Sequence, residues 1–313
     1  MAVIPKLGGS PFLTDAGLET CMVFKDGLEL PCFASFVLLD NPRGRACLDL
    51  YYGKFQQLAE EHGAGLVLDS PTWRSNSDWG AAVGYDQGAL DKINRDAIDY
   101  IANLRAQSSI ADQTVLNAVV GPRGDGYQAD AVMSAAEARA YHARQIGLAA
   151  DAGADMASAI TMTHTEEAEG IAMAARDAGL PCVVSFTVET DGRLPTGMTL
   201  VEAVRRVDDA LNGDVAYYMI NCAHPSHFAG ALDEVGLAQR IGGIRANASR
   251  MSHAELDSAE ELDEGDPVQL GQDYRGLLAA LPHLCVIGGC CGTDHRHVAA
   301  AAEACLPAMR ARN

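Results

Sequence analysis

Apolar and polar positions along the chain follow two alternating patterns. Short runs of consecutive apolar residues, typical of strands buried on both faces, precede longer segments with apolar residues at helical spacing. Glycines commonly separate a helical segment from the next apolar run. The predicted strands cover residues 12–15, 66–69, 114–120, 155–160, 182–187, 216–221, 242–246 and 284–287. The predicted helices cover residues 48–62, 87–107, 134–152, 165–178, 199–211, 226–235, 267–281 and 294–305.

This repeated strand-then-helix order predicts parallel strands joined by helical crossovers. A closed (β/α)8 TIM barrel, forming one α/β domain over residues 1–313, fits best, and a doubly wound open sheet is the alternative. No Gly-x-Gly-x-x-Gly follows the first strand, which weighs against dinucleotide binding. The acidic segment 249–266 is expected to be a long excursion after the seventh strand. In the first long helix we expect one shared buried face, formed by Leu50, Phe55, Leu58 and Ala59.

Charge and composition narrow the functional class. The formal net charge is −19 and no basic stripe occurs, which argues against a nucleic-acid partner. No apolar stretch of about 18 residues occurs, and the N-terminus lacks the long apolar core of a signal peptide. The chain has nine cysteines without the framework of a small disulfide scaffold, which indicates reduced thiols, some of them metal ligands. We therefore expect a cytoplasmic protein with small-molecule substrates and no membrane partner; the oligomeric state stays open.

Three cysteines stand at the ends of predicted strands. Cys222 follows the sixth strand, and Cys290 and Cys291 follow the eighth between two pairs of small residues. In a barrel, the C-terminal ends of these strands lean over the same mouth, where active sites of this fold lie. Three thiolates with an open fourth position suit a catalytic zinc ion. Cys222 alone would more often be a small buried apolar residue, but the set as a whole favours zinc.

These residues resemble the homocysteine S-methyltransferase family over nearly the whole chain. The most specific matches are Asn221-Cys222 and the segment 288–293, and further similar segments are 13–20, 37–42, 185–187 and 197–200. The resemblance implies a zinc-dependent transfer of a methyl group from an activated donor, such as S-methylmethionine or betaine, to homocysteine, which gives methionine. It implies that a Zn²⁺ cofactor is held by Cys222, Cys290 and Cys291, where the acceptor thiolate would attack the donor.

The resemblance also implies substrate contacts. Asp15 matches the family's aspartate near the amino-acid substrate, although aspartate is also common in turns. Trp73 stands where the family tends to place a tyrosine and would hold a cationic donor, the alternative being ordinary packing. Asn221 and Asn247 would orient the zinc ion or the substrate. Three more aromatic residues are weaker candidates, for which packing is favoured: Phe33, Phe36 and Trp79.

One position departs from the family pattern. The family usually has a glutamate near the end of the fourth strand, which pairs with the amino group of homocysteine, and Ile160 stands there in this chain. A buried ammonium without its carboxylate is strongly destabilised. Either Glu166, Glu167 or another carboxylate substitutes, or the acceptor is a different thiol. Further alternatives are a demethylase of a methylated sulfur or nitrogen compound, and a noncatalytic zinc-binding barrel that docks to a corrinoid or folate partner.

Overall fold

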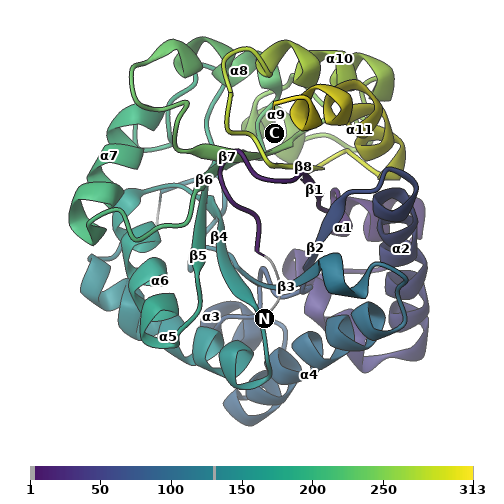
Figure 1. Cartoon of the computed structure of the whole chain (residues 1–313). Helices are drawn as coiled ribbons and strands as arrows, with labels where there is room; N and C mark the ends of the chain where they lie inside the picture. The colour runs from purple at the N-terminus through teal and green to yellow at the C-terminus, as the bar shows by residue number, and fades with distance from the viewer. Residues whose placement is uncertain (1–3, 130–131, 313) are drawn as a thin grey trace.

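The computed structural model describes residues 4–129 and 132–312, and over these residues the chain forms the predicted closed barrel. All strand pairs are parallel and follow chain order, and β1 closes the ring against β8 (Figure 1). The strands are β1 (Phe12–Leu13), β2 (Gly65–Asp69), β3 (Thr114–Val120), β4 (Met156–Met162), β5 (Cys182–Phe186), β6 (Tyr218–Asn221), β7 (Ile241–Ala246) and β8 (Val286–Gly289).

Helices surround the ring of strands in Figure 1. The long ones are α2 (Pro42–Glu61), α4 (Gln87–Ala106), α5 (Ala135–Asp151), α6 (Thr165–Asp177), α7 (Leu200–Leu211), α10 (Pro267–Leu277) and α11 (His295–Arg310). Short helices are α1 (Leu18–Thr20), α3 (Ser77–Ala82), α8 (Pro225–Phe228) and α9 (His253–Asp257). Short segments of 3₁₀ or π helix cover Cys21–Lys25, Pro31–Phe33, Ser35–Asp40, Ala111–Gln113 and Ala229–Asp233. None of the described helices is both long and apolar enough to cross a membrane.

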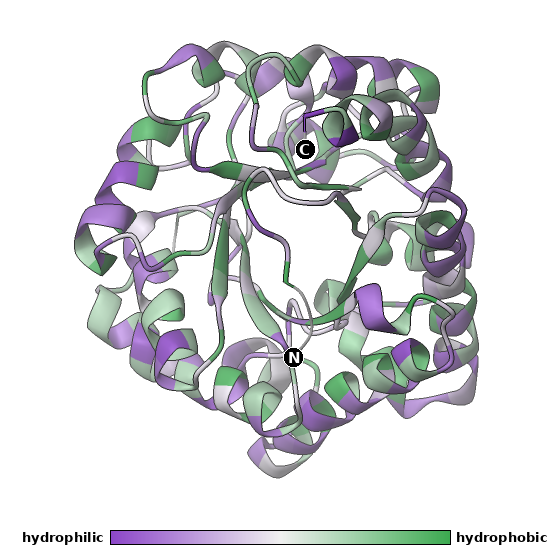
Figure 2. Ribbon diagram, viewed as in Figure 1, coloured by the Kyte–Doolittle hydropathy of each residue, from purple (hydrophilic) through white to green (hydrophobic). Residues whose placement is uncertain are grey.

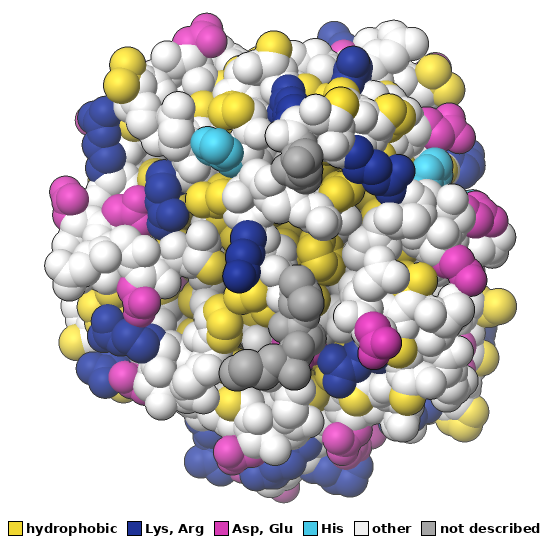
Figure 3. Space-filling view, in the orientation of Figure 1, with side chains coloured by type: hydrophobic (Ala, Val, Ile, Leu, Met, Phe, Trp, Pro, Cys, Tyr) yellow, Lys and Arg dark blue, Asp and Glu magenta, His cyan; other side chains and the backbone are white. Residues whose placement is uncertain are grey.

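Two groups of buried side chains form the core. Successive strand residues point to opposite faces, so each strand contributes to the barrel interior and to the layer under the helices. The interior group includes Val67, Val119 and Met219, and the larger outer group fills the space between strands and helices. Figure 2 shows the resulting hydrophobic strands and the mixed helix surfaces. Acidic and basic side chains are interspersed over the face shown in Figure 3.

The first long helix begins earlier than predicted, and three of the four residues predicted for its buried face are buried: Phe55, Leu58 and Ala59. Asn41 caps α2 by accepting a hydrogen bond from the Gly44 N–H at 2.6 Å, and Pro42 occupies the first helical position. The prediction that Leu50 lies on the buried face is wrong, because this side chain is 71% exposed. Leu48 and the two tyrosines after Leu50 are buried as well, whereas Leu50 lies five positions before Phe55 and so points about 140° away from it around the helix.

Candidate metal centre and substrate cavity

Three cysteine sulfurs converge at the mouth of the barrel. Cys222 follows β6, Cys290 and Cys291 follow β8, and their Sγ atoms all lie within 4.8 Å of one another. The Sγ atoms of Cys222 and Cys291 are 4.0 Å apart, and Cys222 and Cys290 are joined as a disulfide, with Cα atoms 5.4 Å apart. The sequence predicts reduced thiols here. The convergence that suits a metal ion also brings two sulfurs within bonding reach, so the set can hold a metal only when reduced.

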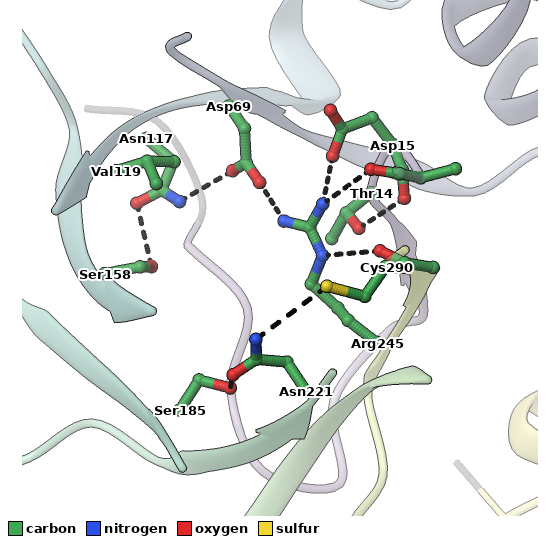
Figure 4. Close-up of polar contacts among 12 residues, drawn as sticks. Thr14, Asp15, Asp69, Asn117, Val119, Ser158, Ser185, Asn221, Arg245 and Cys290 are labelled. Atoms are coloured by element: carbon green, nitrogen blue, oxygen red, sulfur yellow. Dashed lines mark hydrogen bonds and ion pairs between the residues drawn. The ribbon is translucent and has the colours of Figure 1, made fainter. Parts of the chain in front are cut away.

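The backbone at the end of β6 turns two neighbouring side chains towards the cysteines. Adjacent strand residues normally point to opposite faces, but Cys222 has a φ of 52°, in the left-handed region that non-glycine residues seldom occupy. Asn221 accepts hydrogen bonds from Ser185 Oγ at 2.6 Å and from the Thr161 N–H at 3.0 Å. Its Nδ2 lies 3.9 Å from Cys290 Sγ (Figure 4). Asn221 therefore links β4, β5 and β6 to the cysteine cluster, and its role in orienting zinc or substrate stays a prediction.

Glycines allow β8 to approach the end of β1 closely. A Cβ on Gly288 would overlap with Thr14 Oγ1 and with the Asp15 carbonyl, and one on Gly289 would overlap with Thr293 Oγ1. A side chain at Gly288 would therefore push β8 away from the segment that carries Asp15, and one at Gly289 would displace Thr293.

Several groups hold or contact the cysteines from outside the two cysteine motifs. Asn247 donates from Nδ2 to the Cys222 carbonyl at 3.1 Å, and His253 Nε2 bonds to the same carbonyl at 2.6 Å. Tyr127, on the loop after β3, has its hydroxyl 3.4 Å from Cys291 Sγ, and its ring stacks on His253 with centroids 4.2 Å apart. Burial raises the pKa of Cys291 to about 11, so this thiol needs a metal or another positive charge to ionise at neutral pH. Sequence reasoning missed Tyr127 and His253; their positions after strands three and seven are the signal that could have indicated them.

An arginine that the sequence analysis overlooked occupies the centre of the barrel mouth. Arg245, on β7, forms ion pairs with Asp15 after β1 and with Asp69 at the end of β2 (Figure 4). Its Nε donates to the Gly289 carbonyl at 3.1 Å, and Asn117 Nδ2 donates to Asp69 Oδ1 at 2.7 Å. The network ties together strands β1, β2, β3, β7 and β8. Asp15 thus already has a cationic partner within the chain, and its contact with a substrate stays a prediction.

This network should make stability depend on pH. Burial raises the pKa of Asp15 from its usual 3.8 to about 7, although Arg245 opposes the shift. Between about pH 4 and pH 7 the folded chain therefore binds a proton that the unfolded chain has lost, so this group's contribution to stability falls as the pH rises. Urea unfolding measures the free energy of unfolding of the wild type minus that of Asp15→Asn. We expect this difference to decrease as the pH rises from about 4 to 7 and to stay constant outside this range. A difference in the free energy of unfolding that did not change with pH would contradict the raised pKa of Asp15.

A cavity of about 480 Å³ adjoins the cysteines and is large enough for small-molecule substrates. All three cysteines line it, as do Trp73, Asp15 and Arg245. Its other walls include Phe24, Phe33, Trp79, Leu256 and Leu262. The last two belong to the excursion at 249–266, which contains α9 and contributes to the cavity wall. Phe36 is buried in the core, and packing is sufficient to explain it.

Comparison with known proteins assigns the chain to a family. A profile of the homocysteine S-methyltransferases matches residues 54–305, which is most of the chain. The chain belongs to the homocysteine S-methyltransferase family. It is therefore a methyltransferase on the TIM-barrel fold, with a cysteine triad arranged as a possible metal site. A search of curated protein sequences gives no match.

Solved structures of one family member share this barrel. The metallated form of the homocysteine methyltransferase MmuM from Escherichia coli has a TM-score of 0.71 at 21% identity, covering 94% of this chain and 96% of that one. Its oxidized form has a TM-score of 0.71 at 22% identity, covering 93% and 94%. Its apo form has a TM-score of 0.65 at 20% identity, covering 97% and 96%. At these identities the likeness establishes the fold.

Proposed function

We propose that this methyltransferase moves a methyl group from an activated donor, such as S-methylmethionine or betaine, to the thiol of homocysteine, and forms methionine. The supporting observation is the convergence of Cys222, Cys290 and Cys291 beside a cavity in a member of this family. Three sulfur ligands fit zinc, which prefers tetrahedral nitrogen and sulfur sites and keeps one position open in catalytic centres. Bound zinc would supply the positive charge that keeps the acceptor thiol ionised at neutral pH.

The residues of the chain hold this site and shield it. Asn247 and His253 both bond to the Cys222 carbonyl, which fixes the left-handed backbone that turns the sulfur into the mouth. The aromatic and aliphatic walls of the cavity keep water from the reacting groups. A sulfonium or quaternary ammonium donor becomes neutral when it loses its methyl group, so the leaving group needs no proton. The site therefore requires positioning and an ionised thiol more than an acid–base pair.

The carboxylate that replaces the family's usual glutamate is, in this proposal, Glu19. Ile160 is 7% exposed and packs inside the barrel, while Glu166 pairs with Arg206 and Glu167 with His142, outside the cavity. Glu19 lines the cavity with the cysteines, and Ser35 Oγ donates to its Oε1 at 2.7 Å. Burial raises the pKa of Glu19, and an ammonium group beside it would favour the ionised carboxylate. The amino group of homocysteine is a ligand of that kind.

Glu19→Gln should raise the KM for homocysteine about 10- to 100-fold, because a charge-assisted hydrogen bond to the ammonium is lost. The KM for 4-mercaptobutanoate, which has the same thiol and carboxylate but no amino group, should change little. Steady-state kinetics with both acceptors separates the two effects. Glu166→Gln, outside the cavity, is the matched control. An unchanged KM for homocysteine in Glu19→Gln would assign amino-group binding elsewhere.

The function is tested by incubating reduced, zinc-loaded protein with homocysteine and either S-methylmethionine or betaine, and measuring methionine by mass spectrometry. Methionine formation supports the proposal. Methylation of other thiols alone would favour a related transferase with a different acceptor. Loss of methyl groups from a donor without methylated thiol would favour a demethylase. Zinc binding without any methyl transfer would favour a noncatalytic barrel.

A further inference from the structure

The two tryptophans of the chain enclose a charged side chain in the cavity wall. The Arg74 guanidinium carbon lies 4.2 Å from the ring centroid of Trp73 and 3.9 Å from that of Trp79. Arg74 is only 6% exposed, yet it lines the same cavity as the three cysteines. The Trp73 ring, which the family resemblance assigns to a cationic donor, therefore already contacts a cation of the chain, as does Trp79.

Most of the hydrogen-bonding capacity of this guanidinium is unused. Arg74 Nη1 donates to the Gly124 carbonyl at 2.8 Å, while its buried Nε has no partner. Within residues 4–129 and 132–312, Arg74 forms no ion pair, and Asp125, Tyr127 and Glu19 act on it only as nearby charged or ionisable groups. An arginine carries five N–H donors in one plane. With both faces covered by indoles, its planar N–H edge remains for a ligand, and this edge matches a carboxylate.

We propose that Arg74, held between Trp73 and Trp79, binds a carboxylate group of the methyl donor. This proposal rests on the proposed function and adds to it the residue that recognises the donor: the carboxylate that both S-methylmethionine and betaine carry would pair with Arg74. Asp15 and Glu19, the groups assigned to the acceptor, follow β1, whereas Arg74 follows β2, so the two substrates have separate anchors in one cavity. A methylated cation without a carboxylate would face the positive guanidinium with no negative group of its own to offset the repulsion.

The two tryptophans provide a direct measurement of binding. Reduced, zinc-loaded protein without acceptor is titrated with dimethylsulfonioacetate and, separately, with trimethylsulfonium, which lacks the carboxylate, while tryptophan fluorescence is recorded. Calorimetry repeats the titration, since the substitution itself alters the emission. We expect Arg74→Met to lower the affinity for dimethylsulfonioacetate about 10- to 100-fold. The affinity for trimethylsulfonium should stay weak or improve slightly. Arg74→Lys keeps the charge but not the planar guanidinium group, so its affinity for dimethylsulfonioacetate should lie between those of Arg74→Met and the wild type.

Arg123→Met is the matched control, because Arg123 also stacks on an aromatic ring, that of Tyr141, but pairs with Asp78 outside the cavity. It should bind both compounds as the wild type does. Equal dimethylsulfonioacetate affinity in Arg74→Met and wild type, with native circular dichroism and zinc content, overturns the proposal. So does a loss of homocysteine affinity in place of donor affinity. If binding depended on Arg74 but no methyl group were transferred, only the proposed function would be contradicted. If methyl transfer did not depend on Arg74, only this inference would be contradicted.

Discussion

Cys290→Ala loses most of its zinc and its methyl-transfer activity falls by more than about 100-fold. The substitution removes one of three converging sulfurs, and even groups that only orient metal ligands typically contribute 10- to 100-fold to affinity or activity. Elemental analysis of the purified, reduced protein and a methionine assay measure the two effects. Secondary structure by circular dichroism should stay close to that of the wild type, because Cys290 belongs to neither of the two groups of core side chains.

The matched control is Cys285→Ala. Cys285 is buried directly before β8, the strand that leads to Cys290. Its Sγ contacts the Gly242 carbonyl at 3.4 Å, and it is not part of the cysteine cluster. This variant should keep its zinc and its activity. Oxidation of the wild type should release zinc, and dithiothreitol should restore binding, because the Cys222–Cys290 disulfide and the metal ion compete for the same two sulfurs. Full zinc retention in Cys290→Ala would place the metal elsewhere.

Arg245→Met has the second large expected effect, a loss of about 3–5 kcal/mol in the free energy of unfolding, because two buried carboxylates lose their shared cation. Urea unfolding at pH 8, above the pKa of about 7 that Asp15 has in the wild type, measures this loss. Combining Arg245→Met with Asp15→Asn and Asp69→Asn should recover much of the stability, since no buried charge is then left unpaired.

Arg240→Met is a control for removing an arginine from an ion pair. Arg240 pairs with Asp208 in a partly exposed position, where solvent screens the charges, so its loss should cost less than the loss of Arg245. If Arg245→Met were no more destabilising than Arg240→Met, the central ion pairs would be unimportant for the fold. If the triple variant remained as unstable as Arg245→Met, uncompensated charge would not be the cause.

The barrel could be predicted because its local signals agree with each other. Strand β3 spans the predicted residues, Thr114–Val120, and Gly153 and Gly179 each have a positive φ at the turn that follows a helix. Parallel strands joined by helices follow chain order in a barrel. Strands six and eight could therefore be placed with only strand seven between them before their contacts were known. The convergence of the cysteines follows from that order.

Features that depend on long-range contacts were not visible in the sequence. Arg245 lies inside an apolar-looking run, and its partner Asp15 is 230 positions away, so no local pattern indicates their pairing. Arg74 follows Trp73 directly, yet its insertion between the two indoles also depends on Trp79. The last helix is predicted from the sequence to end at residue 305, but α11 continues to Arg310, with Leu306 and Met309 buried against the core.

The coordination of zinc in the reduced protein tests the central claim most directly. Zinc K-edge X-ray absorption is recorded on zinc-loaded protein before and after addition of homocysteine. The account predicts three sulfur ligands at about 2.3 Å that become four when the thiol binds. Fewer than three sulfurs in the free protein, or a ligand set that homocysteine does not change, would contradict it.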